Sequence, residues 1–419
     1  MSAAPAQHLD LTAPPVATKI GRRSLIVGIV FSIASLILAF VRPDEFYRGY
    51  LLGFMCWLGV SLGSMSIVMI RHLTGGGWGM VIRRILGAAM RTLPGLTILF
   101  IPMVICVLQH RIYPWAMWTV SPDAVLDPHI HEHLAKNKFV LDSYLNASGF
   151  IIRAIIYFAI WNVIAFLLSH WSRQTDHAGA PDNTQKFKAV AGPGLILYGF
   201  TISFAAIDWV MSLDPSWIST IFGLIILIGE VLSAMCFAVV IERILYNYKP
   251  MSEMLKPEFV HDHGKWLLTF VMVWAYFSYS QWLIIWAGNL PNEITFYLRR
   301  LSYGWGWIGL FLALFHFCVP FAILLSRPFK RDIRKLVWLA VWLMFMRYVD
   351  LFWIIEPNFS QRFTVTIADI VVPIAIGGIW LAYFFRNLAT WPLLPAYDPS
   401  AGEVLEPHHH HELGVAENA

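Results

Sequence analysis

The chain contains ten apolar stretches, each long enough to cross a lipid bilayer. A membrane-spanning helix needs roughly 20 predominantly apolar residues, and such stretches follow one another from Ser24 to Arg386. Hydrophobic residues make up 58% of the chain and charged residues only 13%, whereas a soluble domain carries about 25% charged residues. The sequence therefore predicts an all-α polytopic membrane protein and excludes a soluble fold.

The ten-helix domain is expected over residues 21–388, between a flexible tail at 1–20 and an extended tail at 389–419. The first tail lacks the apolar core and cleavage site of a signal peptide. The second is too polar to bury enough apolar surface to fold alone. The expected helices are Ser24 to Phe40, Tyr50 to Ile70, Ile82 to Leu108, Gly149 to Ser169, Gly192 to Ser212, Trp217 to Tyr246, Lys265 to Gly288, Tyr303 to Ser326, Lys335 to Ile355 and Phe363 to Arg386.

The distribution of positive charge predicts the orientation of these helices. Cytoplasmic loops carry an excess of Lys and Arg, and most of the 30 such residues fall on the side of the two termini. Both termini are therefore expected in the cytoplasm. Between the second and third helices, Trp78, Arg83 and Arg84 favour an interfacial amphipathic segment that anchors the chain to the inner leaflet.

The pattern of histidine and cysteine predicts no covalently bound or metal-ligated cofactor and no metal site. Transmembrane heme needs pairs of axial ligands on facing helices, yet His316 is the only histidine deep in an expected span. The cysteines stand singly, without a C-x-x-C motif. No phosphate-binding glycine loop is found, and no nucleic acid partner is expected. The cysteines are Cys56, Cys106, Cys236 and Cys318.

Five ionisable residues inside the expected spans predict a proton path. A charge in hydrocarbon costs several kcal/mol, so such residues face a bundle interior and are functional candidates by default. Arg347 and Asp350 are three apart, on one helix face, and can form an ion pair. A structural reading remains open, in which these groups are hydrogen-bonded contacts between helices. The proton-path residues are Glu230, His316, Arg347, Asp350 and Asp369.

Further polar residues fall in the outer half of the spans and suggest a pocket that opens outward. A quinone head group needs flat apolar walls and a few polar groups that exchange protons with its oxygens. Aromatic residues, 15% of the chain, can supply such walls, although membrane-interface belts account for some of them. The expected quinone-binding residues are Arg153, Asp208, Gln281 and Asn289.

Three segments resemble a known family of membrane subunits. They are IDWVMSLDPSWISTIFG at 207–223, FSYSQWLIIWAGNLPNEITFYLRR at 277–300 and YPWA at 113–116. They look like the NrfD/polysulfide-reductase-like integral membrane subunits, and most like the second quinone-binding-type subunit of bacterial alternative complex III, a quinol:cytochrome c oxidoreductase. The resemblance covers essentially all ten helices.

That resemblance implies two four-helix bundles, formed by helices two to five and six to nine, with one flanking helix at each end. It also implies a respiratory complex in the bacterial inner (cytoplasmic) membrane. The partners would be a paralogous NrfD-like membrane subunit, an iron–sulfur protein and c-type cytochrome subunits, which would hold the heme and the iron–sulfur clusters. Quinol, such as menaquinol, and lipid would be the ligands. This chain would contribute membrane embedding, a quinone pocket and a proton path.

Two other functions stay open on the residues alone. Ten helices with buried charges also suit a proton-coupled secondary transporter, although matched helix breaks in two halves of the chain, which mark many transporters, are not evident. The third reading is a purely structural membrane anchor. Co-purification with heme and iron–sulfur partners would separate a complex subunit from a carrier.

Overall fold

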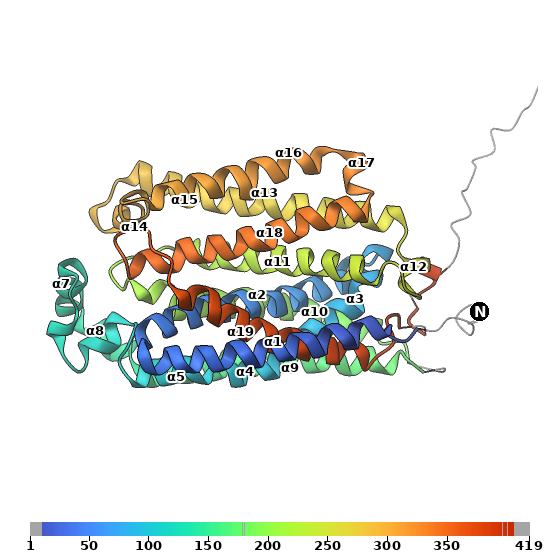
Figure 1. The fold of residues 1–419 in the computed structure, drawn as a ribbon, viewed down its shortest axis with the longest axis horizontal. Helices are drawn as coiled ribbons and strands as arrows, with labels where there is room; N and C mark the ends of the chain where they lie inside the picture. Colours follow the sequence, from blue (N-terminus) through green and yellow to red (C-terminus); the bar gives the residue numbers. More distant parts are fainter. Residues whose placement is uncertain (1–10, 178, 180, 396, 400, 406–419) are drawn as a thin grey trace, which may run out of the picture.

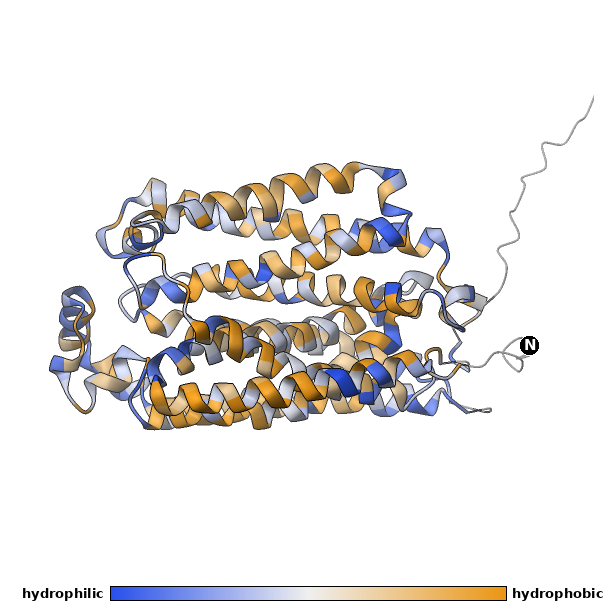
Figure 2. Cartoon of the chain, in the orientation of Figure 1, coloured by the Kyte–Doolittle hydropathy of each residue, from blue (hydrophilic) through white to orange (hydrophobic). Residues whose placement is uncertain are grey.

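The structure is a computed structural model that describes residues 11–177, 179, 181–395, 397–399 and 401–405. In these residues no strand occurs, and ten helical spans are long and apolar enough to cross a membrane. The prediction of an all-α polytopic membrane protein is thereby confirmed. Apolar residues cover the middle of the spans, and hydrophilic residues gather near their ends (Figure 2).

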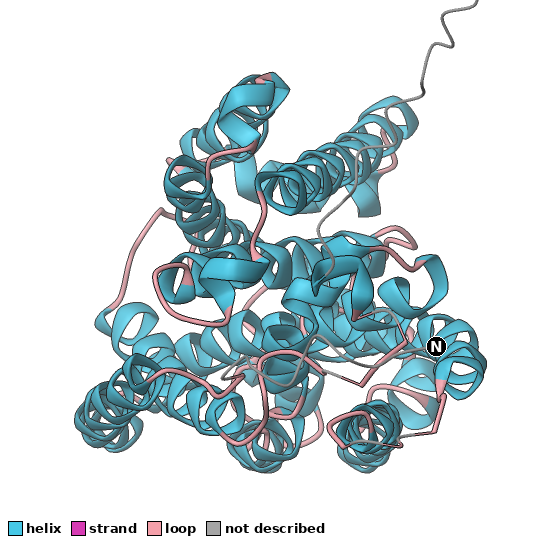
Figure 3. Cartoon of the chain, turned by 90° about the vertical axis from the view of Figure 1, so that its right-hand side faces the viewer, coloured by secondary structure: helices cyan, strands magenta, loops and turns pink. Residues whose placement is uncertain are grey.

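The spans stand side by side along the long axis of the molecule (Figures 1 and 3). The third span is broken into α3, α4 and α5, and a π-helical turn at Ala313–Cys318 joins α15 to α16 within the eighth. The spanning helices are α1 (Pro15–Val41), α2 (Pro43–Thr74), α3 (Gly77–Met90), α4 (Leu93–Leu99), α5 (Ile101–Leu108), α9 (Ala147–Gln174), α10 (Thr184–Trp209), α11 (Phe222–Leu245), α13 (Pro257–Gly288), α15 (Trp305–Leu312), α16 (Val319–Leu325), α18 (Ile333–Ile355) and α19 (Ile367–Ala389).

Short helices lie at the two ends of the bundle. We call the end at which α1 begins and α19 finishes the terminal end, and the opposite end, with α7, α8 and α14, the loop end (Figure 1). The short helices are α6 (Pro114–Trp118), α7 (Pro128–Lys136), α8 (Lys138–Ser143), α12 (Met251–Met254), α14 (Pro291–Leu301), α17 (Arg327–Lys330) and α20 (Gly402–Leu405), with short 3-10 turns at Pro122–Ala124, Met211–Leu213 and Glu356–Asn358.

The helices form two four-helix groups and a flanking pair. In the first group α2 packs on α3, α4, α5 and α10, and α9 packs on α4, α5 and α10. In the second, α11 packs on α13 and α18, and the α15–α16 span packs on α13 and α18. The flanking helices α1 and α19 pack along each other, and α19 also packs on α2.

A close contact between α2 and α11 joins the two groups. Gly59 and Gly63 of α2 face Glu230, and a Cβ atom added at Gly63 would lie 2.1 Å from the backbone oxygen of Glu230. Only glycine allows two helix backbones to approach so closely, as in the small-residue contacts common between membrane helices. Helix α2 packs on α3, α10, α11 and α19 and is buried along most of its length, whereas α1 is largely exposed.

The sixth span begins later than the sequence pattern indicates. Asp214 lies in a turn that precedes α11, where its carboxylate accepts hydrogen bonds from the backbone N–H and the hydroxyl of Ser216. Helix α11 begins at Phe222. Glu230 therefore lies eight residues into the helix, about 12 Å at 1.5 Å per residue, and closer to the loop end than the sequence suggested.

The arginine-rich segment after α2 is not an interfacial anchor, so that expectation is wrong. Arg83 and Arg84 lie in α3 and are buried. Arg83 pairs with Asp398 and Arg84 with Asp176. Buried charges are tolerated when they are paired, and these two carboxylates come from segments distant in the chain, which a local charge pattern cannot reveal.

The tails expected at 1–20 and 389–419 are partly folded where the structure describes them. Helix α1 begins at Pro15, and the backbone N–H of Leu393 donates to the carbonyl of Leu11 over 2.8 Å. Leu394 is buried, and Asp398 is held by Arg83. Residues 11–14 and the described part of 390–405 thus contribute contacts at the terminal end, while residues 1–10, 396, 400 and 406–419 lie outside the described residues.

Candidate functional site

The second helix group contains a cavity of about 630 Å³. Its volume falls in the range of small-molecule sites, which run from about 300 to 1,000 Å³. Tyr276 and Tyr279 line it from the second half of α13 and are well exposed. This part of α13 belongs to one of the ten spans, so these exposed rings are expected to lie at the depth of the bilayer.

Nine of the 20 residues that line the cavity carry flat aromatic rings. They come from α11, α13, α14, the α15–α16 span and α18, so the whole second group contributes. Aromatic rings give large apolar contact area with defined geometry, which suits a planar ligand. The aromatic lining residues are Phe222, Trp274, Tyr276, Tyr279, Trp282, Phe296, Tyr297, Phe317 and Trp353.

The polar side chains that line this aromatic cavity include Gln281, Tyr297 and Asp350. The Gln281 side chain accepts a 2.9 Å hydrogen bond from Ser219 and donates one of 3.3 Å to the hydroxyl of Tyr297. Burial raises the pKa of Tyr297 to about 12, so at neutral pH its hydroxyl keeps its proton and can donate it in a hydrogen bond. Two neutral polar groups and one carboxylate therefore face the same space.

Asp350 is held by two donors from different helices. The guanidinium of Arg347 forms an ion pair with its Oδ2 atom, one turn earlier on α18, and Trp274 Nε1 donates to the same oxygen over 3.2 Å. Both members of the ion pair are buried. The sequence prediction that these two residues pair is confirmed.

Arg347 is accommodated by a glycine on the neighbouring helix. A Cβ atom at Gly229 of α11 would lie 2.1 Å from the guanidinium carbon of Arg347, and Arg347 Nη2 donates to the carbonyl of Ile226 over 3.3 Å. The guanidinium thus lies against α11 directly beside Glu230. The guanidinium of Arg347 thus contacts both the carboxylate of Asp350 and the backbone of α11.

His316 lies next to the cavity, in the π-helical turn of the eighth span. Its ring stacks on Trp274, with ring centroids 4.0 Å apart and planes at 21°. His316 is fully buried, and neither ring nitrogen has a hydrogen-bond partner among the described residues. Single-turn π-bulges are frequent at functional sites, and this one places an unpaired imidazole beside the indole that donates to Asp350.

Glu230 lies at the contact between the two helix groups, on the far side of Arg347 from the cavity. The hydroxyl of Tyr198 on α10 donates to Glu230 Oε2 over 2.7 Å. The other carboxylate oxygen, Oε1, is buried with no hydrogen-bond partner in the described part of the chain. Asp350, Arg347 and Glu230 therefore follow one another from the cavity toward the centre of the molecule.

A second buried titratable pair lies nearer the terminal end, and sequence reasoning missed its histidine. His263 Nδ1 is 3.1 Å from Glu242 Oε2, and His263 Nε2 is 2.9 Å from the carbonyl oxygen of Trp78. Both partners are acceptors, so an imidazolium with two N–H groups satisfies the arrangement. Glu242 lies on α11, 12 residues or about 18 Å beyond Glu230. The sequence feature that could have indicated this pair is the position of His263, directly before the seventh apolar span.

Two of the expected quinone-binding residues lie in the first helix group, away from the cavity. Arg153 forms a bidentate pair with Asp208, with Nε–Oδ2 at 2.8 Å and Nη2–Oδ1 at 3.0 Å. The hydroxyl of Tyr157 also donates to Asp208 over 2.8 Å. This pair links α9 to α10, and neither residue lines the cavity.

Asn289 and Asp369 have local structural roles. Asn289 is exposed and ends α13 in the left-handed conformation, with φ of 45°, a position at which asparagine is well tolerated. Asp369 forms a capping box with Thr366 at the start of α19: its Oδ2 accepts from the backbone N–H and the hydroxyl of Thr366 at 2.7 and 2.9 Å. Of the nine expected site residues, the structure thus gathers Gln281, Asp350, Arg347 and His316 around the cavity, with Glu230 beyond them.

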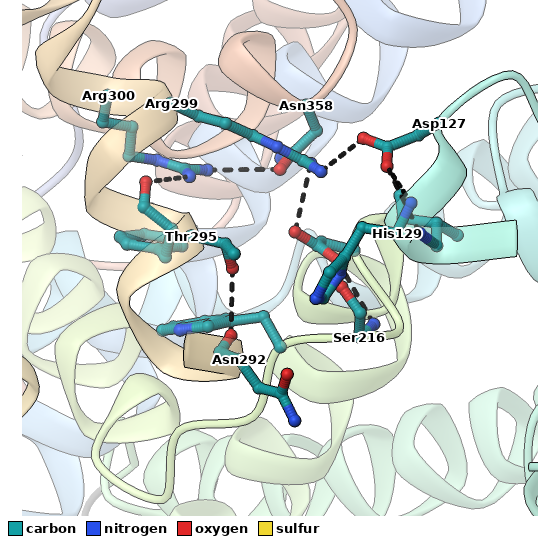
Figure 4. A network of polar contacts seen from close by, with 12 residues as sticks. Asp127, His129, Ser216, Asn292, Thr295, Arg299, Arg300 and Asn358 are labelled. Atoms are coloured by element: carbon teal, nitrogen blue, oxygen red, sulfur yellow. Dashed lines mark hydrogen bonds and ion pairs between the residues drawn. The ribbon is translucent and has the colours of Figure 1, made fainter. Parts of the chain in front are cut away.

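A polar network fixes the helix that covers the cavity at the loop end (Figure 4). Arg299 of α14 bridges Asp127 and Asp214, at 2.5 and 3.1 Å. Burial lowers the pKa of Arg300 to about 9, yet it remains cationic at neutral pH. Arg300 donates to the carbonyls of Trp353 and Ile354 at the end of α18, over 3.1 and 2.5 Å. These contacts hold α14 over the aromatic walls.

Within the described residues, no three His, Cys, Asp or Glu side chains gather in a way that would hold a metal ion. No protein-family model matches this chain, and a comparison with curated proteins finds no matching relative.

Proposed function

We propose that this chain is the membrane subunit of a respiratory quinol:cytochrome c, or high-potential acceptor, oxidoreductase of the NrfD-like, alternative complex III type. The observation that carries the proposal is one carboxylate, Asp350, at an aromatic-walled cavity that opens at bilayer depth. A lipid-dissolved quinol would reach this cavity from the side. Its ring would lie between the aromatic walls, and its hydroxyls would meet Asp350, Gln281 and Tyr297.

The proposed chemistry is a two-electron oxidation of quinol. The quinol loses two electrons and two protons and becomes quinone; the electrons pass to an iron–sulfur cluster of a partner subunit. Asp350, ionised beside Arg347, acts as the general base for both protons in turn: it accepts one from a quinol hydroxyl, passes it on along the path described below, and then accepts the second. The hydroxyl of Tyr297, fixed by Gln281, hydrogen-bonds the other quinol oxygen.

A proton path would continue from Asp350 into the protein. His316 and Glu230 both carry ring or carboxylate atoms without hydrogen-bond partners in the described residues, so each has free capacity to take or pass a proton. Glu242 and His263 would extend this path toward the terminal end. Asp369, held in its capping box, is better explained as a helix cap.

The proposed setting is the bacterial inner membrane, with both termini in the cytoplasm and quinol oxidised near the outer face. The proposed partners are a paralogous membrane subunit, an iron–sulfur protein and c-type cytochromes. Positive charge at the terminal end supports this orientation. The rival transporter function would instead require a solute site open alternately to the two sides.

Purification from the native membrane, with mild detergent, tests the proposal. We expect the chain to arrive with heme and iron–sulfur proteins, and the complex to oxidise a short-chain menaquinol. Asp350→Asn should lower turnover at least tenfold, whereas Glu132→Gln, which removes an exposed carboxylate of α7, should leave it unchanged. A chain that purifies alone and drives solute uptake in vesicles would overturn the proposal.

The proton path has its own test. Glu230→Gln and His316→Ala in the assembled complex should slow proton release measured with a pH-sensitive dye. If both variants keep the turnover and proton release of the parent complex, these two residues are structural contacts only.

A further inference from the structure

A second cavity, of about 330 Å³, lies on the outside of the first helix group near the terminal end. It is bounded by the last turns of α9, the last turns of α19 and the junction between α3 and α4. None of its lining residues lines the aromatic cavity of the second group. Its function is therefore a separate question from the proposed quinol chemistry.

The mouth of this cavity carries two guanidinium groups without an acidic partner. Among the described residues, neither Arg91 nor Arg173 takes part in an ion pair with a carboxylate. Arg91 donates to the carbonyl of Asn387 over 2.7 Å and lies 3.5 Å from the ring centre of Trp391. Asp176, a carboxylate at this end, is already paired with Arg84. The mouth is thus positively charged; Arg91 is fixed by its contacts, and Arg173 is exposed.

Further hydrogen-bond donors lie beside the two arginines. Ser169 lines the cavity from α9, and its hydroxyl is buried with no partner in the part of the chain that the structure describes. His170, exposed on the next position, also lines the mouth. Guanidinium and hydroxyl groups together bind a phosphate well, because arginine matches the geometry of phosphate oxygens.

Below the mouth the lining becomes apolar. Pro94, Ala165, Phe166 and Tyr383 form the walls, and Asn162 marks the far end. From Arg173 to Asn162 is 11 residues of α9, about 16 Å along the helix, which is close to half the roughly 30 Å hydrocarbon thickness of a bilayer.

Asn162 also lines a neighbouring cavity of about 440 Å³, whose walls are almost entirely apolar side chains of α4, α5 and α9. A ligand that fits this shape has an anionic head and a long apolar chain.

We propose that this cavity binds an anionic phospholipid of the leaflet at the terminal end. Its phosphate lies between Arg91 and Arg173, within reach of Ser169, and one acyl chain runs along Phe166 and Tyr383 toward Asn162. Basic pockets between membrane helices bind acidic lipid head groups in this way. A free phosphate ion shares the head-group chemistry but leaves the apolar groove unfilled.

Native mass spectrometry of the purified assembly, stripped of lipid and titrated with phosphatidylglycerol, tests the proposal. Arg173→Gln removes an exposed charge and should weaken phosphatidylglycerol binding about fivefold, the effect of about 1 kcal/mol per basic residue. Arg173→Lys should keep most of the affinity. Arg23→Gln removes an exposed arginine of α1, outside the cavity, and should have no effect.

The head group and the chain are tested apart. Phosphatidylcholine should bind more weakly than phosphatidylglycerol, and inorganic phosphate should fail to displace phosphatidylglycerol at equal concentration. Equal retention of both lipids, displacement by phosphate, or the same loss in Arg23→Gln would overturn the proposal. A cross-link from Phe166→Cys to another protein chain of the assembly would also overturn it, because a protein would then occupy the groove.

Discussion

The hydroxyl of Tyr198 donates a 2.7 Å hydrogen bond to Glu230, and both side chains are almost completely buried. This contact joins α10 of the first helix group to α11 of the second. Glu230 Oε2 accepts this hydrogen bond, whereas Glu230 Oε1 has no hydrogen-bond partner among the described residues. The pair therefore stabilises the contact between the two groups and leaves Glu230 able to bind a proton.

Tyr198→Phe should destabilise the protein by about 1–3 kcal/mol, the usual cost of leaving a buried polar group without its partner. The change keeps the ring and removes only the hydroxyl. A lower melting temperature in detergent is the measurement, with Tyr279→Phe, at an exposed position of α13, as the control. An unchanged melting temperature would show that Glu230 does not depend on this donor.

Removal of either partner of the buried Arg347–Asp350 pair should destabilise the protein by about 3–5 kcal/mol, because the remaining charge is left uncompensated. Arg347→Gln and Asp350→Asn are the single variants. The double variant should be more stable than either, since it leaves no unpaired charge in the interior. Melting temperatures of the four proteins form a double-mutant cycle; additive losses would mean that the two residues do not interact.

Gly63→Ala should destabilise the protein by at least about 2 kcal/mol, because the new Cβ would lie 2.1 Å from the Glu230 backbone oxygen and force α2 and α11 apart. Gly87→Ala is the matched control. Gly87 lies inside α3 with no atom within 4 Å of an added Cβ, so alanine should stabilise there by about 0.5–1 kcal/mol. Similar melting temperatures for the two variants would contradict the close helix contact.

Asp398→Ala should loosen the segment after α19, because Asp398 ties it to the buried Arg83. We expect faster hydrogen exchange in peptides covering residues 390–405, measured by mass spectrometry. The control is Asp262→Ala, which breaks an exposed i,i+3 pair with Lys265. If exchange at 390–405 stays slow in Asp398→Ala, the apolar contacts of Leu393 and Leu394 hold the segment by themselves.

The ten spans could be predicted from the sequence because each one independently satisfies the length and polarity demanded by a bilayer. The residues at which the helices begin and end were harder to predict. Phe222 rather than Trp217 begins α11, because the turn at Asp214 and Ser216 is followed by a non-helical stretch at 217–221. Arg83 and Arg84 resembled a surface anchor because their carboxylate partners are far away in the chain.

The candidate site was only partly visible in the sequence for a related reason. Asp350 and Arg347 share a helix, so their spacing was informative. Gln281 reaches the same cavity from α13, whereas Arg153 and Asp208, at similar expected depth, lie in the other helix group. Depth along a span can be counted from the sequence; which face of which bundle a side chain meets depends on helix packing.

The glycine contact between α2 and α11 has a mechanical consequence. Gly59 and Gly63 bring the two backbones together without intervening side chains. Tyr198 of α10 donates a hydrogen bond to Glu230 at the same contact. A carrier that rocks one half against the other would have to separate this junction in every cycle and expose Glu230 as it did so. The contact therefore holds the two helix groups together, and under the proposed function protons would pass between side chains while the helices stay in place.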